Sequence, residues 1–231
     1  MTLRSAVVGG GTVSGVHLDG LSLNPRTELV AICDTDEDVA REIADEYGIT
    51  AFFDVEAMLE KLDLDWLHIC TPVQTHLPIA KLAIDAGVPV QIEKPITETY
   101  AEFQELAAYA TDHGVTVSEK HNHNFDPAVR TAMAKRRNGE LGDVRGVDVI
   151  YTGSSRPDDP NRGPWNFELA GGEFEEGIPH PVYLTLRTGG YPRSEDAVTA
   201  TTALYDEYDH EFSYDGAQLQ YVTDDEVLCT T

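Results

Sequence analysis

Positive charge is scarce in this sequence. Its 16 lysine and arginine residues face 41 aspartate and glutamate residues, which leaves a formal net charge of −25 at pH 7. Such a surface repels phosphate backbones and acidic lipid headgroups, so we expect neither nucleic acid nor a membrane as a partner. The acidic residues are spread along the chain, which suits a cytoplasm with molar salt, where the screening length falls to ~3 Å. The pattern indicates a halophilic, haloarchaeal source; an acidic mesophilic protein is the alternative.

Cysteine and long apolar runs are also scarce. The three cysteines, Cys33, Cys70 and Cys229, form no CxxC spacing, so we expect no disulfide framework and no metal site. No run approaches the ~20 apolar residues of a membrane span, and the first residues lack the apolar core of a signal peptide, which predicts a cytoplasmic protein. Apolar residues still make up 41% of the 231 residues, enough for one large domain or two modest ones.

The first half alternates short apolar runs with helical spacing. This alternation is typical of βαβ units and predicts a doubly wound parallel sheet, the Rossmann arrangement. Gly48, Gly87 and Gly114 stand where left-handed residues end helices. The predicted strands are Ser5–Val8, Glu28–Cys33, Trp66–Cys70, Val90–Ile92 and Val115–Ser118, and the predicted helices are Val39–Tyr47, Leu77–Ala86 and Tyr100–His113.

The pattern changes near residue 121. We therefore expect a nucleotide-binding domain over residues 1–121 and an α+β substrate and association domain with a mostly antiparallel sheet over 122–231. A loop rich in proline, aspartate and asparagine covers Ser154–Pro164. In this second domain we predict a helix at Asp126–Asn138 and strands at Val144–Tyr151, Ala197–Tyr205, His210–Tyr214 and Ala217–Val222.

A glycine-rich turn follows the first predicted strand. It reads Gly9-Gly10-Gly11-Thr12-Val13-Ser14 and opens a helix, as in turns that bring the backbone close to a pyrophosphate. Asp34 ends the second strand 25 residues after Gly9, near the position of an acid that binds the adenosine ribose hydroxyls. A carboxylate there repels a 2′-phosphate, which favours NAD over NADP, with Asp36 as a helper or a helix cap. A glycine turn without a ligand is the alternative.

Several further motifs agree in order and spacing, and with them the first half resembles the Gfo/Idh/MocA oxidoreductases. The matching residues are Gly9, Gly11, Ser14, His17, Asp34, Thr71-Pro72, His76, Ala86-Gly87 and Glu93-Lys94-Pro95. The resemblance implies that Lys94 contacts the substrate hydroxyl and the nicotinamide ribose. We expect Glu93 to orient Lys94 or the nicotinamide side rather than to act on substrate. The implied cofactor-binding residues are Gly9, Gly11, Thr12, Val13, Asp34, Thr71, Pro72, His76, Glu93 and Lys94.

The second half resembles the family's substrate domain with more departures. Its Asp-x-x-x-His pair falls on Glu176 and His180, and the resemblance implies that His180 accepts the hydroxyl proton. Pro179 and Pro181 flank His180 and rule out an ordinary helix here, so the pair meets in a loop or at a helix start. Tyr183 stands where a second aspartate is common. The implied substrate-binding residues are Lys94, Asn122, His123, Trp165, Glu176 and His180, with His123 in reserve as the base.

The resemblance implies an NAD-dependent dehydrogenase that acts on the CH–OH group of a sugar or polyol. Lys94, His180 and Glu176 are its expected catalytic residues, and a homodimer or homotetramer is expected. Two alternatives stay open: a redox-type glycosidase that keeps NAD bound, and a non-catalytic nucleotide sensor on the same fold. The chain is shorter than usual members, so it is either compact or lacks part of the C-terminal sheet.

Overall fold

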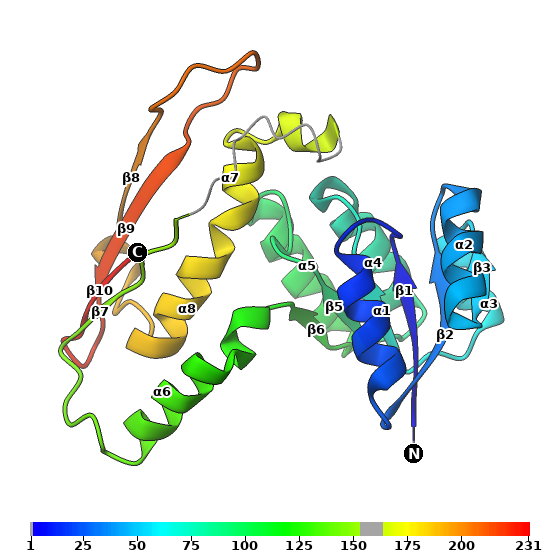
Figure 1. The fold of residues 1–231 in the computed structure, drawn as a ribbon, viewed down its shortest axis with the longest axis horizontal. Coiled ribbons are helices and arrows are strands. Elements are labelled where there is room, and N and C mark those ends of the chain that lie inside the picture. Colours follow the sequence, from blue (N-terminus) through cyan, green and yellow to red (C-terminus); the bar gives the residue numbers. More distant parts are fainter. Residues whose placement is uncertain (1, 153–163) are drawn as a thin grey trace. The chain divides into compact units, whose positions relative to one another are not determined.

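The computed structural model describes residues 2–152 and 164–231. It divides into two compact units, Met1–Lys120 (unit 1) and His121–Thr231 (unit 2). Figure 1 follows the chain from the parallel sheet of unit 1 to the helices and second sheet of unit 2. Each unit is built around its own sheet, and the two are described in turn.

Unit 1 is a doubly wound parallel sheet of six strands. The strand order is β3-β2-β1-β4-β5-β6, and every neighbouring pair is parallel. The strands are β1 (Leu3–Val8), β2 (Thr27–Cys33), β3 (Thr50–Phe52), β4 (Trp66–Ile69), β5 (Val90–Ile92) and β6 (Val117–Glu119). The helices are α1 (Ser14–Leu23), α2 (Glu37–Tyr47), α3 (Val55–Lys61), α4 (His76–Asp85) and α5 (Tyr100–His113), with a 3₁₀ turn η1 (Val73–Thr75) before α4.

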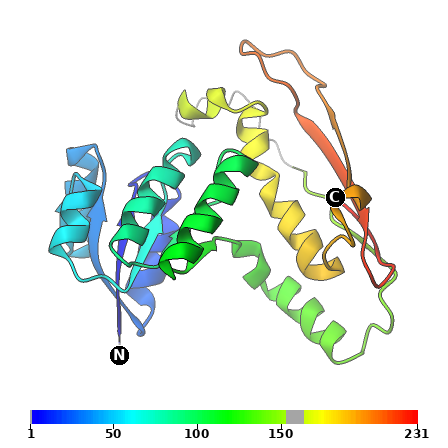
Figure 2. The ribbon, with the colours of Figure 1, turned by 180° about the vertical axis from the view of Figure 1, so that it is seen from behind.

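The core of unit 1 lies on both faces of this sheet. In β1, Ala6 and Val8 belong to a buried cluster with α3, α4 and α5, whereas Val7 between them belongs to a cluster with α1 and α2. Successive strand residues point to opposite faces, so a strand covered on both sides is apolar throughout. Figure 1 shows α1 in front of the sheet, and Figure 2, from behind, shows α4 and α5 on the other face.

The direction in which strands are added to the sheet reverses at β1. From β1 the chain winds outward through β2 and β3, then returns to β4 on the other side of β1 and winds outward again. The carboxyl ends of β1, β4 and β5 therefore share one edge of the sheet. In open α/β sheets this edge, at the strand where the order reverses, is where ligands bind.

The sequence-based fold class is confirmed, with the elements of unit 1 near their predicted positions. Gly48 and Gly114 end α2 and α5 in the left-handed conformation, each with a φ of 67°. Two elements were missed, the three-residue strand β3 and the helix α3, which begins at the cap Asp54. The segment Thr50–Phe52 contains a single large apolar residue, whereas the equally short β5 has valine and isoleucine at its ends, so only β5 shows an apolar strand pattern.

Unit 2 pairs helices with a mixed four-stranded sheet of order β7-β10-β9-β8, parallel only between β7 and β10. Helix α8 packs on it, since Leu186 joins the cluster of Tyr221, Val227 and Cys229. The helices are α6 (Pro127–Arg137), α7 (Gly172–Gly177) and α8 (Pro179–Gly189), the strands β7 (Gly146–Asp148), β8 (Thr199–Ala203), β9 (Gly216–Val222) and β10 (Leu228–Thr230), and the 3₁₀ turns η2 (Asn122–Phe125), η3 (Pro164–Glu168) and η4 (Glu195–Ala197).

The prediction of a strand at His210–Tyr214 was wrong. This segment is irregular, and its backbone is held by a bond from the Ser213 N–H to the Ala170 carbonyl at 2.6 Å rather than by a neighbouring strand. Phe212 is buried, which accounts for the apolar alternation that suggested a strand. The predicted Val144–Tyr151 strand shrinks to the three residues of β7. The expected loop Ser154–Pro164 lies outside the described residues except for Pro164.

Among the described residues, no helix is long and apolar enough to cross a membrane. The cysteines Cys33, Cys70 and Cys229 are buried free thiols. Burial, with Asp54 and Asp34 nearby, raises the pKa of Cys33 to about 12, so this thiol stays protonated and packs as a small apolar side chain.

Substituting two glycines near α1 tests the packing of unit 1. A Cβ at Gly10 would lie 2.5 Å from Val39 Cγ1 and 2.9 Å from Ile43 Cδ1, so Gly10→Ala should lower the free energy of unfolding by about 1–3 kcal/mol. The matched variant Gly20→Ala adds a Cβ in open space inside α1 and should raise it by about 0.5–1 kcal/mol. Urea unfolding measures both; equal effects of the two substitutions would contradict the packing.

Candidate functional site

The turn after β1 requires glycine at two positions and is open at a third. Gly9 has a φ of +95°, and a Cβ there would lie 2.7 Å from the Cys70 carbonyl oxygen. Gly10 is closed in by α2, as described above. A Cβ at Gly11 would meet nothing within 4 Å. The first two glycines therefore allow the close packing of the turn, while the surface at Gly11 and the exposed Thr12 and Val13 is accessible to a ligand.

Asp34 joins the end of β2 to this turn. Its Oδ2 accepts the Gly10 N–H at 2.6 Å, and its Oδ1 accepts the Asp36 N–H at 2.8 Å. Both carboxylate oxygens are thus held in place by backbone donors, and each can accept further hydrogen bonds. Asp36 is the N-cap of α2, where its side chain accepts the N–H groups of Asp38 and Val39. Of the two roles left open for Asp36, the structure shows the cap.

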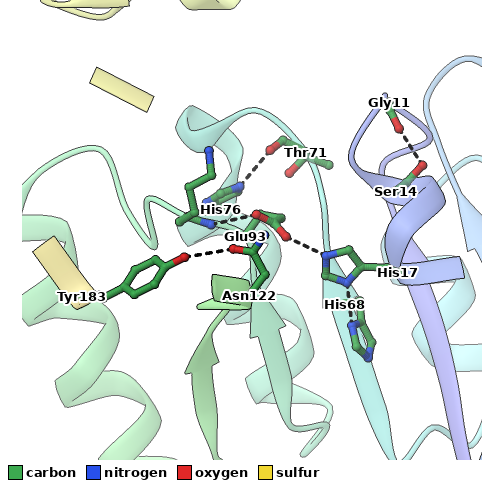
Figure 3. Close-up of polar contacts among 10 residues, drawn as sticks. Gly11, Ser14, His17, His68, Thr71, His76, Glu93, Asn122 and Tyr183 are labelled. Atoms are coloured by element: carbon green, nitrogen blue, oxygen red, sulfur yellow. Dashed lines mark hydrogen bonds and ion pairs between the residues drawn. The ribbon is translucent and has the colours of Figure 1, made fainter. Parts of the chain in front are cut away.

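Helix α1 begins on backbone partners alone, since the Ser14 N–H donates to the Gly11 carbonyl at 3.0 Å and the Val16 N–H to the Val13 carbonyl at 3.2 Å. No side chain caps it, and its first turn contains no acidic residue. Ser14 turns back instead, with its hydroxyl donating to the Gly11 carbonyl at 2.7 Å (Figure 3). A helix start of this kind favours a negatively charged group, because no acidic side chain offsets the positive end of the helix dipole. Together with Gly11 and Asp34, it fits the pyrophosphate and ribose of a dinucleotide.

A buried polar chain connects α1 with β4 and β5. His17 in α1 donates from Nε2 to Glu93 Oε1 at 2.7 Å, and its Nδ1 lies 3.0 Å from Nδ1 of His68 in β4 (Figure 3). His17 is 3% exposed and Glu93 7%. His17, one of the residues that match the family motif, is therefore buried in a polar contact inside unit 1. No short-range signal predicts the chain, since its partners lie 51 and 76 residues apart.

Glu93 connects this chain with Lys94. Burial raises the pKa of Glu93, but the hydrogen bond from His17, the charge of Lys94 and the Lys94 backbone N–H outweigh burial, so the pKa lies below its usual value. That N–H lies 3.3 Å from Glu93 Oε2. Glu93 is therefore an ionised carboxylate next to the half-buried Lys94, at the carboxyl end of β5. That Glu93 orients Lys94 or the nicotinamide side stays a prediction.

His76 links two loops at the same edge of the sheet. Its Nε2 lies 2.8 Å from the Thr71 carbonyl oxygen and its Nδ1 3.0 Å from the Pro95 carbonyl oxygen. The ring is 1% exposed. It thus holds the Thr71-Pro72 loop next to the Lys94-Pro95 loop, and a direct contact between His76 and a cofactor stays a prediction.

In unit 2, the candidate residues gather around the buried phenol of Tyr183. Its hydroxyl donates to Asn122 Oδ1 at 3.0 Å (Figure 3), lies 2.8 Å from His180 Nδ1, and accepts the His123 N–H at 3.2 Å. The His121 ring stacks on Tyr183, with centroids 4.3 Å apart. His121 is the first residue of unit 2, and its ring belongs to this cluster. Tyr183 stands where the family commonly has a second aspartate, but no local pattern predicts that it forms the centre of the cluster.

Glu176 and His180 lie on either side of a helix break. Glu176 belongs to α7 and His180 to the first turn of α8, so of the two arrangements predicted, the structure shows the helix start. The break follows from Pro179 and Pro181, which lack the N–H groups that would continue α7. Trp165 is half-buried in η3.

The glycine turn, Asp34 and the doubly wound sheet define unit 1 as a dinucleotide-binding Rossmann domain. Residues 3–121 match the Gfo/Idh/MocA family, described as an oxidoreductase family with an NAD-binding Rossmann fold, and the chain belongs to this family.

Three relatives show the extent of the likeness. The chain is 30% identical to dTDP-3,4-didehydro-2,6-dideoxy-α-D-glucose 3-reductase of Streptomyces violaceoruber over 78% of its length, and 29% identical to inositol 2-dehydrogenase of Rhizobium meliloti over 88%. It covers 53% and 59% of those proteins, about half their length. A third relative is GenD2 from gentamicin A biosynthesis, whose crystal structure is in complex with NAD. The superposition covers 99% of this chain and 64% of the GenD2 chain, with 27% sequence identity and a TM-score of 0.82. The two curated relatives are bacterial and do not support a haloarchaeal source.

His68 should make the stability of unit 1 depend on pH. Burial, with His17 and Lys120 nearby, lowers the pKa of His68 from 6.5 to about 3. Between these two pH values the unfolded chain binds a proton at His68 that the folded chain does not bind. The contribution of His68 to the free energy of unfolding is therefore complete above pH 6.5 and falls by about 1.4 kcal/mol for each pH unit below it. At pH 5 the loss is about 2 kcal/mol.

Urea unfolding from pH 7 to pH 5 measures this, with a Trp165→Phe background leaving Trp66 in β4 as the only tryptophan. His68→Gln should reduce the pH slope by close to one proton, and His113→Gln, an exposed histidine of α5, should leave it unchanged. A slope unaffected by His68→Gln would contradict the account.

Proposed function

We propose that this chain is an NAD-dependent oxidoreductase that transfers a hydride between a CH–OH group and nicotinamide. The observation that carries the proposal is the geometry of the turn after β1, where Asp34 binds Gly10 at 2.6 Å next to the open surface at Gly11. The family match over residues 3–121 supports it, as does the NAD bound to GenD2. When bound, NAD would supply the hydride acceptor.

Asp34 favours NAD over NADP. Its carboxylate is held at the end of β2 by two backbone donors, so it cannot swing away to admit a phosphate. Its remaining lone pairs suit the two ribose hydroxyls, whereas a 2′-phosphate would meet a negative charge. The proposed cofactor residues are therefore Asp34, the backbone from Gly9 to Val13 and, on the nicotinamide side, Thr71-Pro72 and Glu93-Lys94.

Lys94 and His180 are proposed to act on the substrate. The ammonium group of Lys94, next to the ionised Glu93, stabilises negative charge that develops on the substrate oxygen. A neutral imidazole at His180 accepts the hydroxyl proton. Asn122, His123, Trp165 and Glu176 are proposed to bind substrate.

The substrate class is proposed to be a sugar or polyol. One named relative is a reductase of a dTDP-linked deoxysugar, and another is an inositol dehydrogenase. Both names describe oxidation or reduction at a ring carbon, in a keto-deoxysugar in one case and in a cyclic polyol in the other. Lys94 and His180 match the chemistry of such a reaction, since one stabilises the oxygen and the other transfers its proton.

Cofactor binding is tested by calorimetric titration with NADH and NADPH. The wild-type chain should bind NADH more tightly. Asp34→Ala should reduce that preference about tenfold or more, because the repulsion of the 2′-phosphate is removed. Gly11→Ala should weaken NADH binding about tenfold or more without changing stability, because its Cβ fills open surface that the pyrophosphate needs. Gly20→Ala, at the far part of α1, is the control with unchanged affinity. Tighter binding of NADPH would contradict the assignment of Asp34.

Turnover is tested with a panel of sugars, polyols and their nucleotide-linked forms, followed by NADH absorbance. Lys94→Ala should lower kcat/KM by about 100-fold or more, because the charge that stabilises the substrate oxygen is lost. Lys61→Ala, an exposed lysine in the last turn of α3, should not change it. Normal NADH binding with no turnover on the whole panel would count against the proposed reaction.

A further inference from the structure

We infer that Tyr183 is a positioning residue that fixes which ring nitrogen of His180 carries the proton, so that Nε2 is the basic atom. The inference rests on the proposed function, in which His180 accepts the substrate proton. It goes beyond that proposal because it names the accepting atom and the side chain that selects it.

The phenol of Tyr183 is held from several directions within unit 2. Tyr183 is 4% exposed and lies in α8, one helical turn after His180. The His121 ring stacks on it with an interplanar angle of 22°. Its hydroxyl meets His180 Nδ1 at 2.8 Å, Asn122 Oδ1 at 3.0 Å and the His123 backbone nitrogen at 3.2 Å. The hydroxyl therefore cannot reorient without losing one of these bonds.

The directions of the hydrogen bonds at the Tyr183 hydroxyl determine the tautomer of His180. The His123 N–H can only donate, and the Asn122 amide oxygen can only accept. The single hydroxyl proton of Tyr183 is donated to Asn122. The bond to His180 must then use a proton on the histidine, so Nδ1 carries the hydrogen and the neutral ring has its lone pair on Nε2. This is the reverse of the form that a free histidine side chain prefers in water.

Other titratable groups lie near His180. The His123 ring is 4.8 Å from it and pairs through Nδ1 with Asp126 at 2.9 Å, and the Tyr151 ring is 5.8 Å away. The same reasoning gives His123 an Nδ1 proton, but its acceptor is a carboxylate. Tyr183 gives His180 a neutral acceptor instead, where the family resemblance predicts an aspartate. A neutral acceptor orients the ring without the added stabilisation of the imidazolium that a carboxylate gives.

The test is the ¹⁵N spectrum of the imidazole nitrogens in the ¹⁵N-histidine-labelled chain, without substrate or cofactor. His180→Gln identifies the His180 signals among the eight histidines. In the wild type, Nδ1 of His180 should be protonated and Nε2 unprotonated. Tyr183→Phe, which keeps the ring that stacks on His121, should shift the population toward the Nε2–H form. Tyr151→Phe removes the hydroxyl of a second tyrosine whose ring centroid lies 5.8 Å from that of His180; it is the matched control and should change nothing.

A second variant tests the proton account at an exposed residue. Asn122→Ala removes the acceptor of the Tyr183 proton, so the hydroxyl can donate to His180 Nδ1, and the Nε2–H form should increase. Tyr183→Asp should keep the proton on Nδ1 and raise the imidazole pKa of His180 by about one unit or more. An Nε2–H tautomer in the wild type, or no response to Tyr183→Phe and Asn122→Ala, would overturn the inference.

Kinetics distinguish failure of this inference from failure of the proposed function. Tyr183→Phe should lower kcat about tenfold with little change in KM, because binding is kept while the proton acceptor is mispositioned. If the spectra show no Nδ1–H form but turnover is observed, only the role of Tyr183 is contradicted. If the spectra show the Nδ1–H form but no substrate turns over, the tautomer is confirmed and the proposed reaction is contradicted.

Discussion

The hydrogen bond from the Gly10 N–H to the Asp34 carboxylate, 2.6 Å long, joins the two features on which the nucleotide site depends. It ties the glycine turn after β1 to the end of β2, and α2 closes over it, so that a side chain at Gly10 would meet Val39 and Ile43. The turn is thereby held in one shape before any ligand arrives. A site that is already shaped loses little conformational freedom on binding, which favours affinity.

The edge of the sheet beyond this turn is held by buried polar contacts rather than by apolar packing. His17 connects Glu93 with His68, and His76 bridges the loops that follow β4 and β5. Buried polar groups are costly unless they are paired, so these contacts specify one arrangement of the loops. They place Lys94 next to an ionised carboxylate, the surroundings that its proposed role requires.

Local sequence patterns predicted most strands and helices of unit 1, but few of the contacts at the candidate site in unit 2. Continuous apolar runs and the glycines at helix ends are short-range signals, so the strands around β1 and the ends of α2 and α5 could be predicted. The link from His17 to Glu93 spans 76 residues and the one from Asn122 to Tyr183 spans 61, and no local pattern encodes either. At His210–Tyr214 the apolar residues alternate as in a strand, but the segment is a loop in which Phe212 is buried. The alternation therefore led to the wrong prediction of a strand.

Hydrogen–deuterium exchange of the wild-type chain with and without NADH tests the central claim most directly, because it reports on the backbone of the turn itself. Bound NADH should slow exchange in peptides covering residues 9–16 and 34–36, where the turn, the start of α1 and Asp34 form the proposed site. Peptides of α3 should exchange at unchanged rates. NADH binding that leaves residues 9–16 unprotected would contradict the account.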